Sequence, residues 1–189
     1  VKDVAESEIS KDVKQIESLN FRTKGIDRNN LELSSRYYLA MNRLIQDEKL
    51  AALAIRCWPE LPNVLGQWPY LAMARLLSEN KAVGCEGDVD GAVTCMLGNL
   101  MGFGPGYLSD WLEHDENTIA TWHTGNSFLQ LLERSSSNEG PVITTHFNNK
   151  KPTVVEGTLK SGLNVTIARL WRCNNQYNIM AFDAETLPP

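Results

Sequence analysis

The chain has 189 residues, of which 42% are hydrophobic, so it can bury the core of one large domain or of two small ones. Its formal net charge is -5 without a basic stripe, which argues against partners such as nucleic acid or anionic lipid. No apolar stretch approaches the roughly 18 to 20 residues of a membrane span, and the polar N-terminus is unlike a secretion signal, so we predict no membrane partner.

Two amphipathic helices are predicted at the start of the chain. Apolar residues recur at helical spacing across residues 6–19 and again across residues 30–48, where Asn30 is a plausible N-terminal cap. Residues 50–55 then form a short, nearly all-apolar run, which is typical of a strand buried on both faces. The prolines within residues 59–62 predict an irregular loop after this strand.

Strand and helix alternate in the next part of the chain. Pro69 suits the first turn of a helix over residues 70–77. A second buried strand is predicted at residues 82–85, and apolar spacing predicts a helix from residue 88 to residue 101. This alternation indicates an α/β fold, with parallel βα units and helices packed against the sheet.

The character of the sequence changes after the glycines of residues 102–106, which we interpret as a hinge because the Lys-Ser/Thr ending of a phosphate loop is missing. Short segments rich in β-branched and aromatic residues follow, at residues 117–123, 142–147, 153–159, 163–171 and 176–182. They predict an antiparallel sheet or barrel. We therefore divide the chain into an α/β domain over residues 1–110 and a β-rich, barrel-like domain over residues 111–189.

The cysteines, Cys57, Cys85, Cys95 and Cys173, lie far apart, and none forms a Cys-x-x-Cys pair. This spacing argues against a structural zinc cluster and against a dense disulfide framework. We expect reduced, mostly buried thiols and a cytoplasmic protein.

Glu86 follows the second predicted strand, at the carboxyl end where α/β sheets bind ligands. Gly87 permits a sharp turn there, and Asp88 is interpreted first as the cap of the next helix. For Glu86 itself two interpretations stay open. It is either a surface carboxylate after a strand or a functional group in a partly buried place, where an unpaired charge would be costly.

Asp110 and His123 are the other candidate functional residues. Asp110 would lie at the junction of the two predicted domains, where clefts commonly form, although it could equally serve as a turn or cap residue. His123 ends a strand-like segment, and its alternative role is that of a hydrogen-bonded structural residue. His146, beside Phe147, gives no mechanistic clue. Two carboxylates and an imidazole together indicate a divalent-metal site, and the imidazole shifts the preference from Mg²⁺ toward Mn²⁺.

Several segments resemble the L-fucose isomerase and L-arabinose isomerase superfamily. Residues 85–94, Cys-Glu-Gly-Asp-Val-Asp-Gly-Ala-Val-Thr, resemble its Glu-Gly-Asp segment, and Asp110 in Tyr-Leu-Ser-Asp-Trp resembles its second acidic position. Residues 122–126, Trp-His-Thr-Gly-Asn, are similar to the histidine segment of the arabinose-isomerase branch. The similarity runs from about Leu53 to Arg172, and residues 162–170 resemble a strand of the C-terminal β domain.

The resemblance implies a metal-dependent aldose–ketose isomerase that acts on a free sugar through an enediolate, usually with Mn²⁺. It implies that Glu86 and Asp110 are metal ligands and the catalytic acid/base pair, and that His123 binds metal or substrate. It also implies that residues 1–110 are the C-terminal portion of a substrate domain and that the full-length protein is a homo-oligomer.

The chain departs from this superfamily in two respects. The superfamily's N-terminal domain is absent, and no His-His pair occurs before Pro189 to supply the further metal-binding histidine. We therefore expect a fragment with an incomplete barrel, an incomplete site and little activity of its own. The alternative is a non-catalytic sugar-binding or regulatory protein on the isomerase scaffold. A third possibility is a structural domain whose acidic residues are caps and surface charges.

Overall fold

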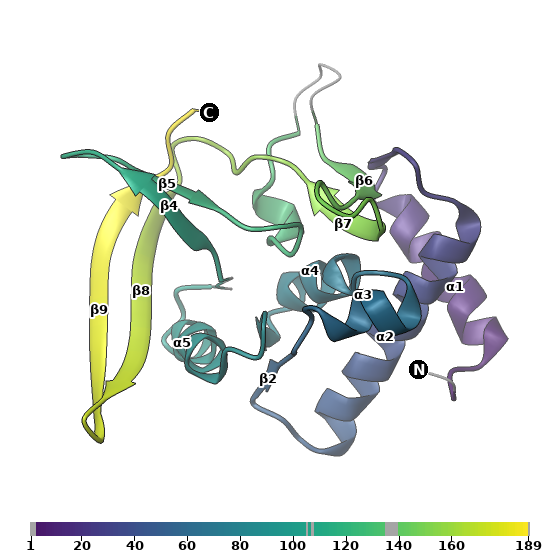
Figure 1. Ribbon diagram of the computed structural model, residues 1–189, viewed down its shortest axis with the longest axis horizontal. Helices are drawn as coiled ribbons and strands as arrows, with labels where there is room; N and C mark the ends of the chain where they lie inside the picture. The colour runs from purple at the N-terminus through teal and green to yellow at the C-terminus, as the bar shows by residue number, and fades with distance from the viewer. Residues whose placement is uncertain (1–2, 105, 107, 135–139, 189) are drawn as a thin grey trace.

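The computed structural model describes residues 3–104, 106, 108–134 and 140–188 (Figure 1). Its helices are α1 (Glu6–Ser18), α2 (Arg28–Asp47), α3 (Glu60–Leu65), α4 (Tyr70–Ser78), α5 (Val89–Leu100) and the short 3-10 helix η1 (Leu129–Leu131). Its strands are β1 (Arg22–Thr23), β2 (Ala52–Ala54), β3 (Ala82–Gly84), β4 (Asp110–His114), β5 (Ile119–Trp122), β6 (Val142–Thr145), β7 (Pro152–Glu156), β8 (Asn164–Cys173) and β9 (Gln176–Glu185). Helices and strands are thus mixed along the chain, which places it in the α/β class at the coarse level.

The predicted N-terminal helices are present, but the predicted cap of α2 is wrong. Asp27 is the cap, and its carboxylate accepts a hydrogen bond from the backbone N–H of Asn30 at 2.9 Å. The Asn30 side chain accepts the backbone N–H of Asp27 in return, at 3.0 Å. Asn30 therefore closes a capping box one turn inside the helix.

A helix replaces the irregular loop that the prolines predicted after β2. Pro59 precedes α3, and Pro62 lies in its first turn, where backbone N–H groups have no partner within the helix. The missing N–H of Pro62 therefore costs no helical hydrogen bond. The helix ends at Gly66, whose φ of 75° is the left-handed conformation that glycine adopts easily.

Strands β2 and β3 pair in parallel, with Ala52, Leu53 and Ala54 opposite Ala82, Val83 and Gly84. Strand β6 pairs in parallel with β1 and antiparallel with β7, while β4–β5 and β8–β9 are separate antiparallel hairpins. Within the described ranges the sheets have three, two, two and two strands, and none closes into a barrel. The barrel-like arrangement expected for residues 111–189 is therefore not confirmed.

The mixed sheet joins β1 to strands that lie more than a hundred residues later, on the other side of the predicted boundary. The division into residues 1–110 and 111–189 stays a prediction.

Helix α4 is the centre of the hydrophobic core and lies below β6 and β7 in Figure 1. Met73 and Leu76 pack with Val83 of β3 on one side, and Leu71 packs with Ile143 of β6 on another. Burying one such side chain contributes about 1.5 to 3 kcal/mol. Although α4 is apolar, no helix in the described part of the chain is long and apolar enough to cross a membrane.

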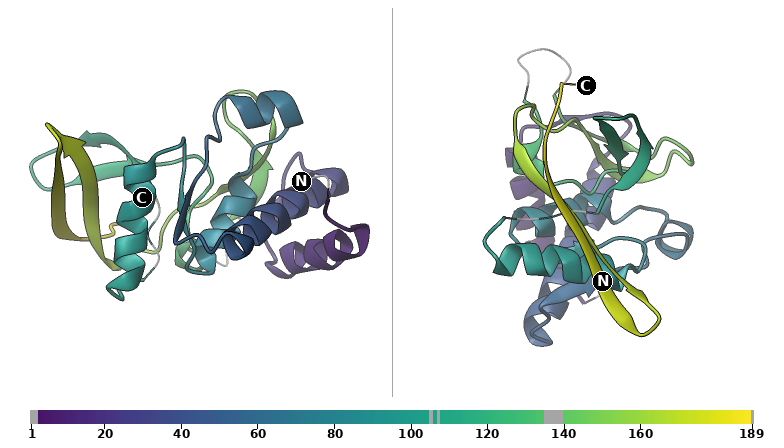
Figure 2. Two further views of the ribbon diagram at one scale, coloured as in Figure 1. Left: turned by 90° about the horizontal axis from the view of Figure 1, so that it is seen from below. Right: turned by 90° about the vertical axis from the view of Figure 1, so that its left-hand side faces the viewer.

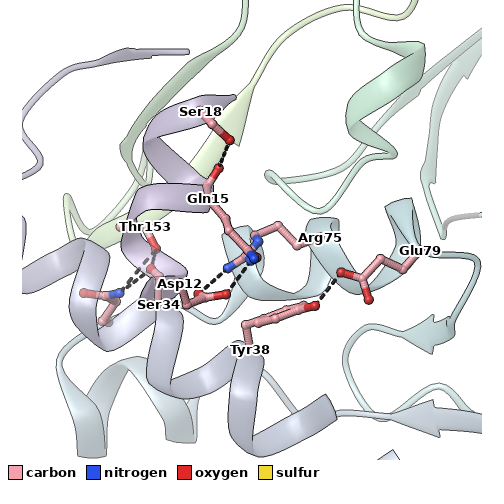
Figure 3. Close-up of polar contacts among 9 residues, drawn as sticks. Asp12, Gln15, Ser18, Ser34, Tyr38, Arg75, Glu79 and Thr153 are labelled. Carbon is pink, nitrogen blue, oxygen red and sulfur yellow. Dashed lines mark hydrogen bonds and ion pairs between the residues drawn. The ribbon is translucent and has the colours of Figure 1, made fainter. Parts of the chain in front are cut away.

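A buried ion pair connects α4 to α1 (Figure 3). The Arg75 guanidinium donates two hydrogen bonds of 2.7 Å to the Asp12 carboxylate, and the exposed fractions of the two side chains are 8% and 5%. The same guanidinium lies 3.8 Å from the ring centroid of Tyr38 on α2. Tyr38 in turn donates a hydrogen bond to Glu79, and burial followed by this bond raises the pKa of its hydroxyl. Three helices are thus held together around one desolvated charge pair.

Replacing Asp12 by Ala should lower the free energy of unfolding by about 3 to 5 kcal/mol, because it leaves the Arg75 charge buried without its partner. Urea denaturation measures this loss. The matched control is Glu32→Ala, which removes an exposed pair with Arg28 on α2 and should cost less than about 1 kcal/mol. Equal losses in the two variants would contradict the proposed role of the buried pair.

Candidate functional site

Glu86 lies in a tight turn, residues 85–88, that joins β3 to α5. Glu86 and Gly87 have φ angles of 56° and 74°, so two successive residues are left-handed. This conformation is uncommon for a non-glycine residue, and such backbone strain is concentrated at functional sites. The Glu86 side chain is exposed to solvent rather than partly buried.

Backbone hydrogen bonds attach this turn to the segment that follows β2. The N–H of Ile55 donates to the carbonyl of Gly84 at 2.9 Å, and the N–H of Gly87 donates to the carbonyl of Ile55 at 2.8 Å. The Glu86 N–H donates to the Sγ of Cys57 at 3.2 Å. Glu86 therefore lies at the common carboxyl edge of the paired strands, as the sequence predicted.

Asp88 is the cap of α5, as predicted, and it also contacts a distant strand. Its Oδ1 accepts the backbone N–H of Gly91 at 2.8 Å, and its Oδ2 accepts a hydrogen bond from Arg169 of β8. Burial opposes the charged form, but the bonds from Arg169 and Gly91 outweigh it and hold the pKa of the Asp88 carboxyl below its ordinary value. The hydroxyl oxygen of Thr94 on α5 also accepts a hydrogen bond of 3.1 Å from the backbone N–H of Leu170 on β8. The β8–β9 hairpin is thereby fixed on α5, which lies between it and the helices of the first half of the chain (Figure 2).

Asp110 and His123 are brought together by the β4–β5 hairpin. Asp110 begins β4 and is the register partner of Trp122, the last residue of β5, and His123 follows directly. Burial lowers the pKa of the His123 imidazole, while the charges of Asp110 and Glu86 raise it, and the net pKa is below the ordinary value. Both predicted carboxylates therefore act electrostatically on the predicted histidine.

His123 and Asn126 carry buried polar atoms that have no hydrogen-bond partner among the residues that the structure describes. The Nδ1 of His123 is one, and both side-chain amide atoms of Asn126 are others, although Asn126 is 0% exposed. Asn126 is held inside because Gly125 lies against β7, where an added Cβ would come within 2.6 Å of Val154. An unsatisfied buried polar group costs about 1 to 3 kcal/mol, so we expect a water molecule, an ion or a ligand to pair with these atoms.

The donor types fit a divalent cation, because carboxylate oxygens and an imidazole nitrogen with no other partner are what Mn²⁺ prefers. However, no group of three or more His, Cys, Asp or Glu side chains in the described ranges is arranged to hold a metal ion. The roles of Glu86, Asp110 and His123 as ligands therefore stay predictions, and so does Mn²⁺.

A row of aromatic rings adjoins His123, and it was not predicted from the sequence. We call it the aromatic stack, and its members are Trp58, Trp68, Tyr70, Trp122, His146 and Phe147. Neighbouring ring centroids are 5.3 Å apart for Trp58 and Trp68, 4.4 Å for Trp68 and His146, 4.7 Å for His146 and Phe147, and 5.2 Å for Phe147 and Trp122. Tyr70 stacks on Trp68 and meets the His123 ring edge-on at 5.8 Å.

The ends of this stack are open to solvent. Trp58 is 48% exposed, Trp122 44% and Phe147 54%, whereas Trp68 and His146 are buried. Exposed rings supported by buried ones form an apolar surface that reaches Asp110 through its register partner Trp122, and apolar surfaces of this kind are common in small-molecule sites. The only sign of this stack in the sequence is that Trp122 and Phe147 directly adjoin His123 and His146. The rings come from four separate segments, so sequence spacing could not predict their contact.

The cysteines are mostly buried, as predicted, and only Cys173 is exposed. The Sγ atoms of Cys57 and Cys85 lie 2.8 Å apart beneath the Glu86 turn, and Tyr70 Oη is 3.6 Å from Cys57. The hydrogen bond with Cys85 lowers the pKa of the Cys57 thiol and raises that of Cys85.

Comparison with known proteins identifies relatives that are named sugar isomerases, although no protein-family model matches the chain. A sulfoquinovose isomerase of Alkalicoccus urumqiensis is 31% identical over 193 residues, which cover 98% of this chain and 42% of that protein. A sulfoquinovose isomerase of Priestia megaterium (strain ATCC 12872 / QMB1551) is 28% identical over 178 residues, or 92% of this chain and 39% of that protein. One of Clostridium sp. (strain MSTE9) is 29% identical over 140 residues, or 72% and 30%.

The chain thus spans at most 42% of the length of the curated relatives it matches. The relationship to sugar isomerases agrees with the sequence analysis at this coarse level. The finer resemblance to the L-fucose and L-arabinose isomerase superfamily stays a prediction.

The buried His146 predicts a pH-dependent stability. Burial, followed by the positive charges of His123 and Lys150, lowers the pKa of His146 below 6.5. Between that lowered pKa and 6.5 the unfolded chain binds a proton that the folded chain does not, so the free energy of unfolding falls as the pH falls through this window. One such group contributes a slope of at most about 1.4 kcal/mol per pH unit.

Denaturation of the wild type and of His146→Gln, at about pH 7.5 and about pH 5.5, tests this sign. The stability difference between the two proteins should narrow at the lower pH. The control is Phe147→Leu, which disturbs the same stack without removing a titratable group. The difference in stability between the wild type and this variant should not narrow at the lower pH. A His146→Gln difference that widens at low pH would refute the prediction.

Proposed function

We propose that these residues form part of a metal-dependent aldose–ketose isomerase that acts on a free sugar through an enediolate intermediate. The names of the relatives make sulfoquinovose, a sulfonated aldose, the first substrate to test, with fucose and arabinose as neutral alternatives. The observation that carries the proposal is the similarity of this chain to proteins named sulfoquinovose isomerase, and the position of Glu86 at the carboxyl edge of β2 and β3 is compatible with it. The homo-oligomeric state and the cytoplasmic location belong to the same proposal.

The reaction moves a proton between two adjacent carbons of the sugar while the carbonyl and hydroxyl groups exchange. Two carboxylates can perform this transfer, one ionised to remove the proton and the other protonated to serve the neighbouring oxygen. Glu86, held rigidly in its strained turn, and Asp110, at the start of β4, are the candidates for this pair. Each comes from a different structural element, so they can lie on different sides of a substrate.

Glu86, Asp110 and His123 are also the residues that would hold the cation. When bound, a divalent metal supplies a positive charge that stabilises the developing oxyanion. The Nδ1 of His123, for which the described part of the chain offers no hydrogen-bond partner, supports its assignment to this set.

The aromatic stack is proposed to hold the sugar ring. The C–H face of a sugar is apolar and packs on an aromatic face, which leaves the hydroxyl groups free for polar partners. Trp58 and Trp122 are exposed at the two ends of the stack, and Trp122 lies opposite Asp110 in the hairpin. The stack would therefore position the sugar next to the proposed acid/base pair.

A second candidate function, a non-catalytic sugar-binding or regulatory protein, is favoured by one observation. Within the described ranges no set of three ligand side chains is assembled for a metal. On this alternative the aromatic stack would bind sugar without a cation. On the isomerase proposal these residues alone are a fragment with an incomplete site and little activity.

The first test is the activity of the full-length natural protein that contains these residues, stripped of metal and then supplied with Mn²⁺. Glu86→Gln should lower kcat for ketose formation by about 10²- to 10⁴-fold, because it removes the proposed proton acceptor. The matched control is Glu113→Gln, an exposed acid on the same hairpin as Asp110 that should keep its activity. Undiminished turnover in Glu86→Gln would remove the proposed catalytic pair.

Calorimetric titration in the same protein separates the two candidate functions. An isomerase site should lose sugar affinity when the metal is chelated, whereas a sugar-binding module should retain it. Retained affinity together with no turnover on any of the three sugars would favour the binding module.

The second test concerns the aromatic stack. Trp58→Ala should raise KM by about 2- to 12-fold and change kcat less, since a ring contact contributes about 0.5 to 1.5 kcal/mol and each 1.4 kcal/mol is tenfold. Trp58→Phe, which keeps an aromatic face, should restore most of the affinity. The control is Trp171→Ala on β8, which removes an exposed tryptophan outside the stack. If Trp171→Ala and Trp58→Ala raise KM equally, the stack is not the sugar surface.

A further inference from the structure

Cys57 and Cys85 lie closer together than two thiols in ordinary contact. Their Sγ atoms are 2.8 Å apart, and a disulfide bond requires about 2.05 Å. The two residues follow the parallel strands β2 and β3, so the pairing of those strands sets the distance between the sulfurs. Both side chains are buried, with 0% and 2% exposed.

The backbone around both cysteines is held by hydrogen bonds that do not involve sulfur. Ile55 donates to Gly84 at 2.9 Å and accepts from Gly87 at 2.8 Å, which connects the segments on either side of the cysteine pair. Cys57 donates its own N–H to Ile55 at 2.8 Å. The sulfurs are therefore presented to each other by a fixed frame, and less than 1 Å of movement brings them to bonding distance.

We propose that Cys57 and Cys85 form a reversible intramolecular disulfide when the protein meets a peroxide. The sulfur of Cys57, which accepts the Glu86 N–H, attacks one oxygen of hydrogen peroxide, and the O–O bond breaks to give a sulfenic acid and water. The sulfur of Cys85 then attacks the Cys57 sulfur and displaces its hydroxyl group as a second water. In sum, two thiols and one peroxide give one disulfide and two waters, and the two electrons pass to the peroxide.

The remaining cysteines lie in different surroundings. Cys95 is buried on α5, and Cys173 is exposed at the end of β8. A disulfide in a reducing compartment is usually transient and serves redox sensing, which is compatible with the reduced thiols expected for this chain.

Oxidation should be felt at Glu86, because this residue follows Cys85 and its N–H bonds to Cys57. Drawing the sulfurs together moves the Cys57 Sγ, which accepts the Glu86 N–H, and so alters a hydrogen bond that holds Glu86 in place. Only this consequence, a loss of turnover on oxidation, rests on the proposed function. Formation of the bond does not.

The test uses the full-length protein with Cys173→Ser, which prevents cross-linking between molecules through the exposed thiol. The protein is treated while folded with hydrogen peroxide, unfolded in an alkylating agent and analysed by mass spectrometry of its peptides. The expected product is a Cys57 peptide linked to a Cys85 peptide, lighter by two hydrogen atoms, that is separated again by dithiothreitol. This measurement needs no substitution at either cysteine, so it does not depend on how such variants fold.

Two further variants in the same background sharpen the result. Cys57→Ser should abolish the linked product, whereas Cys95→Ser should leave it unchanged. Alkylation of both Cys57 and Cys85 after peroxide treatment would overturn the proposal, and so would a linked pair that includes Cys95 or oxidation of single cysteines to sulfinic acid. A linked pair without loss of turnover would leave the disulfide established and would refute only its consequence at Glu86.

Discussion

The parallel pairing of β2 and β3 is the constraint on which the candidate site depends. Only three residues of each strand pair, yet this register places Cys57 next to Cys85 and sets the start of the turn that carries Glu86. The strands are held in turn by α4, whose buried side chains pack against β3 and β6 alike. Because α4 also carries Arg75, the ion pair with Asp12 ties this central helix to the N-terminal helix. A strained turn can persist here because its surroundings are fixed from several directions.

The candidate site draws on elements that are far apart in the sequence. The β4–β5 hairpin supplies Asp110 and His123, the β3–α5 turn supplies Glu86, and the aromatic stack collects rings from both halves of the chain. Burial lowers the pKa of the His123 imidazole at this site, and the charges of both carboxylates oppose that shift. The similarity to proteins named sulfoquinovose isomerase gives this arrangement a chemical context.

Local patterns predicted much of the fold, whereas long-range contacts were beyond them. Apolar spacing located α1, α2 and α5, Pro69 located the start of α4, and the Gly-Asp turn correctly located the cap of α5 at Asp88. The cap of α2 was wrong because Asp27 and Asn30 are both good capping residues, and only their reciprocal hydrogen bonds decide between them. Helix α3 was missed because prolines were treated as breakers, although the first helical turn tolerates them. The position of Glu86 followed from strand order, but His146 and Trp58 acquire meaning only when folding brings their rings together.

The hydrogen bond between Asp88 and Arg169 connects the β8–β9 hairpin to the turn that carries Glu86. Asp88 both caps α5 and ends that turn, so a single residue joins the hairpin to the segment that carries Glu86. The pair is only partly shielded, since 42% of the Arg169 side chain and 28% of the Asp88 side chain are accessible to solvent. Dissolved salt weakens an exposed ion pair, although a partly buried pair in direct contact is screened less than charges separated by more than a Debye length of about 8 Å. The strength with which the hairpin is attached to this turn therefore depends partly on the salt concentration of the solution, and not on the polypeptide alone.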